Sequence, residues 1–116
     1  MQSDLLILRD KLRAFAAERD WEQFHSPKNL SMAMMVEAAE LLEHFQWLTE
    51  AQSADLSTDK KLEVGEELAD VLLYLVRLSD TLGVDLLDAA LRKLDKNALR
   101  YPADKVRGSN KKYSEY

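Results

Sequence analysis

The sequence predicts an all-α protein built as a four-helix bundle. Apolar residues recur at the three- and four-residue spacing of helices, and no run alternates in the way a half-buried strand does. Only three Gly and two Pro interrupt 116 residues. With 47% hydrophobic and 32% charged residues, the composition is that of an ordered domain. We expect one domain over residues 1–116, with a tail over 102–116. Because so small a bundle leaves much surface uncovered, we also expect it to assemble into an oligomer.

The first two helices are predicted from periodicity and from the position of Pro27. The first spans residues 4–19, in which the apolar positions are Leu5, Leu8, Leu12, Phe15 and Ala16. Residues 21–26 then form an irregular connector ahead of Pro27, and such an aromatic-rich loop is a candidate for ligand contact. The second helix begins at a cap on Asn29 or Ser31 and runs to Thr49.

The third and fourth helices are predicted from their end signals. Residues 50–57 are polar and turn-like. The third helix starts at Thr58 or Asp59 and continues to residue 82, where Gly83 takes the usual position after a helix end. Asp85 caps the fourth helix, which stops at the sequence Tyr101-Pro102.

Composition also excludes several classes of function. A net charge of −5 and a pI near 5.0 argue against binding to a nucleic acid polymer, because phosphate neutralisation needs many cations. The absence of Cys excludes disulfides, thiolate zinc sites and cysteine nucleophiles. No apolar stretch could span a bilayer and the start does not resemble a signal peptide, so we expect a cytoplasmic protein without a membrane partner. Four basic residues gather in the tail: Lys105, Arg107, Lys111 and Lys112. We favour a solvated chain end here over a flap that closes on an anionic ligand.

Two pairs of acids carry the strongest chemical signal. Glu37 and Glu40 are three residues apart, as are Glu67 and Asp70, so each pair projects from one face of its helix. Each pair lies nine residues, or roughly 14 Å, from the turn between the predicted second and third helices. An antiparallel hairpin therefore brings the four carboxylates level with one another.

The surroundings of Asp70 indicate that these acids need a cation. Its neighbours are apolar almost all round the helix, and a buried carboxylate is costly unless it is paired. Oxygen ligands without Cys favour Mg²⁺, with Mn²⁺ as the second choice, while Lys93 or Arg77 could supply the positive charge instead. A di-iron site would need two Glu-x-x-His motifs, and the one present, from Glu22 to His25, lies in a predicted loop.

Aromatic residues continue both acidic stripes. Helical spacing leads from Glu40 to His44 and Trp47, and from Asp70 to Tyr74. Trp47 and Tyr74 are either core residues or, beside the acids, surfaces on which a base stacks; His44 has no predicted role. In the fourth helix, Lys93 and Asn97 lie one turn apart and face either solvent or the phosphates of a bound ligand.

Beyond these patterns, the sequence resembles a known family. The segments 36–41 and 66–72, VEAAEL and EELADVL, are similar to the paired E-x-x-E and E-x-x-D signature of the MazG-type all-α nucleotide pyrophosphohydrolases. Four further segments resemble its dCTP pyrophosphatase branch, so that nearly the whole chain is covered: residues 15–25, 45–47, 97–102 and 112–115. The chain departs from the family pattern at Lys28, Ala38, Ala39 and His44.

The resemblance implies a MazG-like bundle that forms a homotetramer, as a dimer of dimers. It implies that a nucleoside triphosphate is split into a monophosphate and pyrophosphate, with dCTP or modified dCTP preferred, which would cleanse the nucleotide pool. We expect water to attack the α-phosphorus and Glu37 or Glu40 to take the proton. Two alternatives stay open: the same fold acting on dUTP or another dNTP, and a non-catalytic helical oligomerisation module.

The resemblance also assigns residues to ligands. It implies magnesium ligands at Glu37, Glu40, Glu67 and Asp70. The base and sugar would be surrounded by Trp21, His25, Trp47 and Tyr74. The phosphates would be faced by Lys93 and Asn97.

Overall fold

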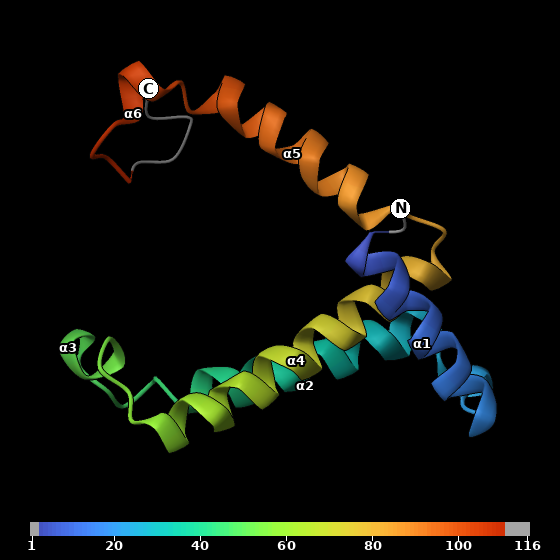
Figure 1. Ribbon diagram of the computed structural model, residues 1–116. Coiled ribbons are helices and arrows are strands. Elements are labelled where there is room, and N and C mark those ends of the chain that lie inside the picture. The colour runs from blue at the N-terminus through green and yellow to red at the C-terminus, as the bar shows by residue number, and fades with distance from the viewer. Residues whose placement is uncertain (1–2, 111–116) are drawn as a thin grey trace. The chain divides into compact units, whose positions relative to one another are not determined.

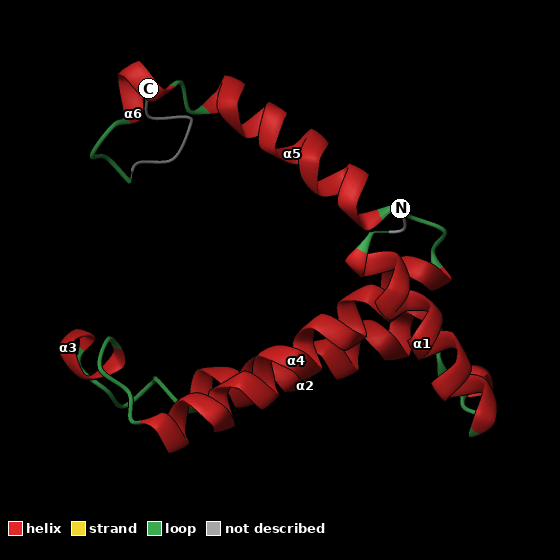
Figure 2. Ribbon diagram, viewed as in Figure 1, coloured by secondary structure: helices red, strands yellow, loops and turns green. Residues whose placement is uncertain are grey.

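The computed structural model describes residues 3–110, and every regular element in that range is a helix (Figures 1 and 2). The prediction of an all-α protein is therefore confirmed. The chain divides into two compact units, one ending at Val84 and the other beginning at Asp85, and each is described by itself. A single domain that joins all four long helices stays a prediction.

The first unit is a helical hairpin with a third helix packed on it. It contains the long helices α1 (Asp4–Glu18), α2 (Pro27–Glu43) and α4 (Thr58–Thr81), the 3₁₀ turn η1 (Glu22–Phe24) and the one-turn helix α3 (Glu50–Ser53). Helices α2 and α4 lie side by side and antiparallel, and α1 packs against α4 (Figure 1). This arrangement is the hairpin that the spacing of the acids predicts.

Few side chains of this unit are fully covered. The buried apolar residues are Ala16, Leu30, Val64 and Val76. In contrast, α2 and α4 each expose a stripe of large apolar side chains at helical spacing: Met32, Met35, Val36 and Leu42 on α2, and Leu62, Leu68 and Leu72 on α4. We call these two sets the apolar stripes. Exposed apolar surface of this kind is typical of interaction sites.

Two long helices end in the same left-handed turn. After α1, Asp20 has a φ of 55°, and the N–H of Trp21 donates to the carbonyl of Ala16 at 2.9 Å. After α4, Gly83 has a φ of 68°, as its predicted role requires. The first turn is unusual because a residue with a Cβ occupies the position that glycine favours. It turns the chain back so that Trp21 lies beside α1.

The bounds of α2 differ from those predicted. The helix begins at Pro27, and the hydroxyl of Ser26 caps it by accepting from the N–H of Asn29 at 3.1 Å. The N–H groups of the first helical turn have no acceptor within the helix, so proline, which lacks an N–H, loses no hydrogen bond there. Pro27 therefore starts the helix instead of closing the connector. The side chain of Asn29 donates to the carbonyl of Phe24 instead of capping. The helix also ends at Glu43, six residues before the predicted end at Thr49.

Side-chain caps also organise the polar segment between α2 and α4. Thr49 and Gln52 form a reciprocal capping box, which creates α3 where the sequence predicts only a turn. Ser57 then caps α4 by accepting from the N–H of Lys60 at 3.2 Å, so that the helix begins at Thr58 as predicted.

The second unit contains α5 (Leu86–Arg100) and the one-turn helix α6 (Ala103–Val106). Asp85 caps α5 as predicted, with its carboxylate accepting from the N–H of Asp88 at 3.0 Å. The helix ends before Tyr101 and Pro102, also as predicted, whereas α6 has no counterpart in the prediction. Lys105 and Arg107 are exposed, and Lys111 and Lys112 fall outside the described residues.

Across residues 3–110, none of the helices combines the length and the apolar character that crossing a bilayer would require.

Candidate functional site

Three carboxylates from the two hairpin helices converge at one point. Glu37 of α2 and Glu67 and Asp70 of α4 each place one oxygen so that the three atoms lie within 4.8 Å of one another. The Oε2 atoms of Glu37 and Glu67 are buried and have no hydrogen-bond partner within residues 3–110. Glu40 is more exposed, but its carboxyl group interacts with those of both Glu37 and Glu67. We call these four residues the acid cluster.

The acid cluster is electrostatically frustrated without a cation. Burial, followed by the neighbouring Glu40, raises the pKa of Glu37 to about 7. Burial and Glu40 also raise the pKa of Glu67, and Asp70 adds to both shifts. A carboxyl group with such a pKa is partly protonated at neutral pH. Some of the cluster's negative charge is therefore neutralised by protons when no cation is present.

The donor set of the cluster suits a hard divalent cation. Its unpartnered oxygens have free lone pairs, and oxygen-only ligands are those of Mg²⁺, Mn²⁺ and Ca²⁺. His44, which caps the end of α2, adds an imidazole Nε2 3.9 Å from Oε1 of Glu67. Arg77 does not supply the alternative positive charge, because its guanidinium pairs with His25 and Asp80. The cluster thus has the chemistry of a cation site.

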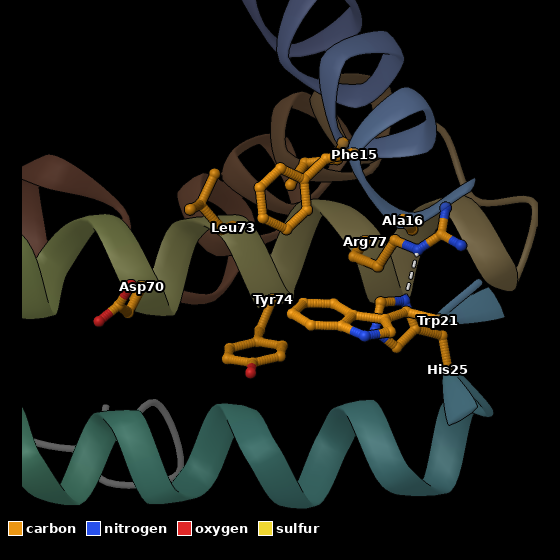
Figure 3. A pocket seen from close by; sticks show the side chains of 9 residues that line it. Phe15, Ala16, Trp21, His25, Asp70, Leu73, Tyr74 and Arg77 are labelled. Atoms are coloured by element: carbon orange, nitrogen blue, oxygen red, sulfur yellow. Dashed lines mark hydrogen bonds between the residues drawn. The ribbon is translucent and has the colours of Figure 1, made fainter. Parts of the chain in front are cut away.

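A pocket of about 220 Å³ adjoins the cluster and shares Asp70 with it (Figure 3). Its walls come from α1, from the connector before α2 and from α4. The lining residues are Leu12, Phe15, Ala16, Trp21, His25, Asp70, Leu73, Tyr74 and Arg77. A mostly apolar pocket with a few convergent polar groups is the usual form of a small-molecule site.

Aromatic side chains form one side of this pocket. The rings of Phe15 and Trp21 meet edge to face, with centroids 5.7 Å apart and planes at 70°. Trp21 and His25 meet in the same way at 6.4 Å. The guanidinium of Arg19 lies over the ring of Phe15, with its carbon 3.6 Å from the ring centroid. Trp21 remains 44% exposed, which leaves ring surface for a ligand.

A chain of polar contacts lies behind the aromatic wall. The Nε–H of Arg77 donates to Nδ1 of His25 at 3.0 Å (Figure 3). Arg77 also approaches Asp80 at 3.7 Å, and Asp80 accepts two hydrogen bonds from Arg13 at 2.7 and 2.6 Å. The hydrogen bonds from Arg13 hold the pKa of the Asp80 carboxyl below its usual range. We call Arg13, Asp80 and Arg77 the relay.

Comparison with known proteins places this helical hairpin in a family. The sequence model of the MazG-like family matches residues 32–116, which include the whole acid cluster. The chain belongs to the MazG-like family.

Individual proteins are also similar to the chain. dCTP pyrophosphatase 1 of Homo sapiens is 50% identical over 103 residues, which are 87% of this chain and 61% of that protein. The Rattus norvegicus protein of the same name is 48% identical over the same shares. A pyrophosphatase from Archaeoglobus fulgidus is structurally similar, with a TM-score of 0.72 and 38% identity over 88% of this chain and 95% of that one. The chain thus spans about three-fifths of the length of the curated relatives.

The hairpin of this MazG-like chain brings together most of the predicted site residues of the first unit. Trp21, His25 and Tyr74 line the pocket, and the acid cluster lies next to it. The prediction that Trp47 continues the helical stripe of Glu40 is wrong, because α2 ends at Glu43 and Trp47 lies in the following turn, 86% exposed. Lys93 and Asn97 belong to α5 of the second unit, and their part in the site stays a prediction.

Sequence reasoning missed five residues that line the pocket. Leu73 and Arg77 continue the helical stripe of Asp70 and Tyr74, so the spacing of α4 could have indicated them. One apolar face of α1 also lines the pocket, through Leu12, Phe15 and Ala16. The sequence indicates that this face is apolar, but it does not indicate which helix or cavity the face contacts. The hydrogen bond between Arg77 and His25 had no sequence signal, since it joins residues 52 positions apart.

Proposed function

We propose that this protein is a Mg²⁺-dependent nucleoside triphosphate pyrophosphohydrolase that prefers dCTP or a modified dCTP. One observation carries the proposal: Asp70 belongs both to the acid cluster and to the aromatic pocket. A ligand that fills the pocket with its base therefore extends its polar end toward a cation site. A nucleoside triphosphate is such a ligand, with an aromatic base at one end and a chain of anionic phosphates at the other.

The preference for the cytosine base rests on similarity. Proteins named dCTP pyrophosphatase 1 share about half of their aligned residues with this chain. The pocket volume of about 220 Å³ is below the roughly 300–1,000 Å³ of sites that enclose drug-sized ligands. A pocket of this volume suits a single base better than a whole nucleotide.

A pool-cleansing role, in which unwanted deoxynucleotides are removed before polymerisation, follows from this proposal.

The acid cluster is proposed as the magnesium site, with Mn²⁺ as a substitute. Glu37, Glu67 and Asp70 supply the converging oxygens, and Glu40 lies beside them. Held there, magnesium would offset the charge of the phosphates and lower the pKa of a bound water. His44 stands close enough to Glu67 to restrain the position of its carboxylate.

The geometry favours Glu40 over Glu37 as the general base. Glu40 is the member of the cluster that stands outside the three converging oxygens and is more exposed to solvent. In the proposed reaction, a water oxygen bonds to the α-phosphorus and its proton passes to Glu40. The bond from the α-phosphorus to the bridging oxygen then breaks, and pyrophosphate leaves with that oxygen. No side chain becomes covalently bound to the substrate.

The base and sugar are proposed to lie against Trp21, Tyr74 and His25, which already line the pocket. The family resemblance adds Trp47 to this group and assigns Lys93 and Asn97 to the phosphates. Trp47 is too exposed to act from its present surroundings, so its contribution requires another part of the assembly to approach it.

Assembly into a homotetramer, as a dimer of dimers, is proposed from the apolar stripes. Seven large apolar side chains on α2 and α4 are between 39% and 67% exposed, which is more than a small monomer usually leaves uncovered in two helices. A second copy of the chain would cover them. We propose a cytoplasmic enzyme that acts on free nucleotides and binds neither nucleic acid polymers nor membranes.

A nucleotide panel tests the proposal. Purified protein with Mg²⁺ is incubated with each dNTP, with dCTP modified on the base and with NTPs, and the phosphate products are identified. We expect dCMP and pyrophosphate from dCTP. Turnover of dUTP without dCTP would overturn the cytosine preference, and no turnover of any nucleotide would favour the oligomerisation module.

Two variants separate the proposed roles within the cluster. Glu40→Gln should lower kcat by about 10²–10⁴ while keeping Mg²⁺ affinity, because it removes the proton acceptor. Asp70→Asn should weaken Mg²⁺ binding, which calorimetric titration measures without turnover. Glu63→Gln, an exposed acid of α4, serves as the control. Equal losses in Glu40→Gln and Glu63→Gln would remove Glu40 from the mechanism.

A further inference from the structure

We propose that the relay holds His25 as a neutral imidazole with its proton on Nε2, so that His25 donates a hydrogen bond to a carbonyl-type acceptor on the edge of the bound base. Arg77 is then a positioning residue for base recognition, and Arg13 and Asp80 support it. The inference rests on the proposed function and extends it to residues outside the acid cluster.

The tautomer follows from the donors that are available. A guanidinium has N–H donors and no acceptor, so the nitrogen that receives the hydrogen bond from Arg77 must present a lone pair. That nitrogen is Nδ1 of His25, at 3.0 Å from Nε of Arg77. A neutral imidazole carries its single proton on the other nitrogen. Nε2 is therefore the donor, and the contact with Arg77 is what places the proton there.

Arg77 can play this part because its own position is fixed. Its side chain is only 11% exposed, and its Nη1 lies 3.7 Å from Oδ2 of Asp80. Asp80 is 12% exposed, and both of its carboxylate oxygens accept hydrogen bonds from Arg13 of α1. A bidentate pair of this kind fixes direction as well as distance. The relay thus joins α1 to α4 and fixes the direction of the Nε–H bond of Arg77.

The charges around His25 keep it neutral. Burial and the positive charge of Arg77 lower the pKa of His25, while Glu22 of η1 acts in the opposite direction. Asp80 is occupied by the two arginines of the relay. Protonation of Nδ1 would break the hydrogen bond and place two positive groups in contact. His25 is for these reasons a fixed donor rather than an acid–base group.

The second ring nitrogen, Nε2, belongs to a side chain that lines the pocket. His25 lines the pocket, and among residues 3–110 its Nε2 has no hydrogen-bond partner. The ring of Trp21 lies beside it at 6.4 Å between centroids, inclined at 62° (Figure 3). A flat ring held against Trp21 would turn its edge toward Nε2. The O2 oxygen of a pyrimidine is an acceptor of the required kind.

The first experiment tests the tautomer without relying on activity. Long-range ¹H–¹⁵N NMR spectra distinguish a protonated from an unprotonated imidazole nitrogen. In the wild type with its full chain, His25 should show an unprotonated Nδ1 and a protonated Nε2. Arg77→Met should mix the two tautomers and raise the pKa of His25, while Arg92→Met, which removes an exposed arginine paired with Asp88 on α5, should change neither. A protonated Nδ1 in the wild type would overturn the proposal.

The second experiment tests recognition. Arg77→Met should raise the KM for dCTP about tenfold with kcat unchanged, the size expected for one lost hydrogen bond. The wild type should discriminate against 2-thio-dCTP, whose sulfur is a weaker acceptor, and Arg77→Met should lose that discrimination. Equal discrimination in both proteins would overturn the role in base recognition even if the tautomer is as proposed.

A second variant shows that the effects do not come from loss of the fold. In Arg13→Met the replaced side chain is exposed on α1, so the far-ultraviolet circular dichroism of the variant should match that of the wild type. It should give a smaller shift of the same NMR signals and KM. Arg77→Lys, which keeps an N–H donor, should partly restore the NMR signals and the KM that Arg77→Met changes, which would separate lost positioning of His25 from lost structure. If the wild type hydrolyses no nucleotide, the proposed function fails, while the NMR result still decides the tautomer.

Discussion

Glu37 is the residue whose ionisation reports most directly on the acid cluster. Its pKa is raised from the ordinary value of 4.5 to about 7, so the folded chain binds this proton more tightly than the unfolded chain does. The stabilisation of the folded state by this proton is fully present below pH 4.5 and is lost as the pH rises through about 7. A cation at the cluster would replace the missing proton at higher pH.

The first prediction concerns the pH dependence of stability in EDTA. Between pH 5 and pH 8, the Tm of the wild type should fall relative to that of Glu37→Gln, which removes the titrating group. Saturating Mg²⁺ should reverse the trend in the wild type. Scanning calorimetry at each pH measures both effects, with Glu63→Gln as the exposed control. A constant difference between wild type and Glu37→Gln across this range would contradict the account.

The second prediction concerns Asp20, a non-glycine residue in the left-handed region. Replacement by Val should destabilise the protein by roughly 1–2 kcal/mol, because a β-branched side chain is poorly tolerated at positive φ. Asp20→Asn should be nearly neutral, since Asn adopts this conformation readily. Urea unfolding measures both. Equal stability of the Val and Asn variants would show that the turn after α1 relaxes without cost.

At the scale of the elements, helix ends decide which parts of the fold the sequence could reveal. Asp85 and Gly83 mark the ends of their helices by local chemistry, so these bounds were predictable. Pro27 was misread because proline both closes connectors and opens helices, and only the cap from Ser26 distinguishes the two. The level arrangement of the acids was predictable because helix spacing is regular.

The position of Trp47 could not be obtained in this way. Helical spacing holds only while the helix continues, and α2 ends four residues before Trp47. The capping box of Thr49 and Gln52 begins α3 only after the turn that contains Trp47. The lining role of Phe15 depends instead on how α1 packs against α4, which no local pattern encodes.

A third prediction addresses α4 as an element. Gly65 lies in the middle of this helix, and a Cβ added there would meet no atom of the chain within 4 Å. Gly65→Ala should therefore stabilise the isolated chain by about 1 kcal/mol through helix propensity alone. Urea unfolding at several protein concentrations measures the change. A destabilisation that grows with concentration would instead show that another copy approaches closely at this position.

For the whole molecule, the core is small, so the burial of further apolar surface by association would add to the stability of the folded state. Only four residues in the described part of the chain are buried apolar residues, while the apolar stripes remain uncovered. A fourth prediction follows. The Tm of the wild type should rise with protein concentration, because association stabilises the folded state by mass action. Sedimentation equilibrium should give a mass above that of one chain.

A single charge on a stripe should disrupt this assembly. Met35 is 62% exposed on α2, and Met35→Glu should lower the sedimenting mass and remove the concentration dependence of Tm. Glu63→Lys, on the exposed surface of α4 away from the stripe, should retain both. An unchanged mass for Met35→Glu would exclude the stripe of α2 from the interface.

The shared position of Asp70 has a thermodynamic consequence. Because one carboxylate borders both the acid cluster and the pocket, occupation of the proposed cation site would alter the energy of the proposed base site, and the reverse. Linkage requires this effect to be reciprocal: whatever factor a cation adds to nucleotide affinity, the nucleotide adds to cation affinity. If the cation raises nucleotide affinity, the two ligands would bind cooperatively, and occupancy would rise more steeply with the concentration of their complex than with that of either ligand alone.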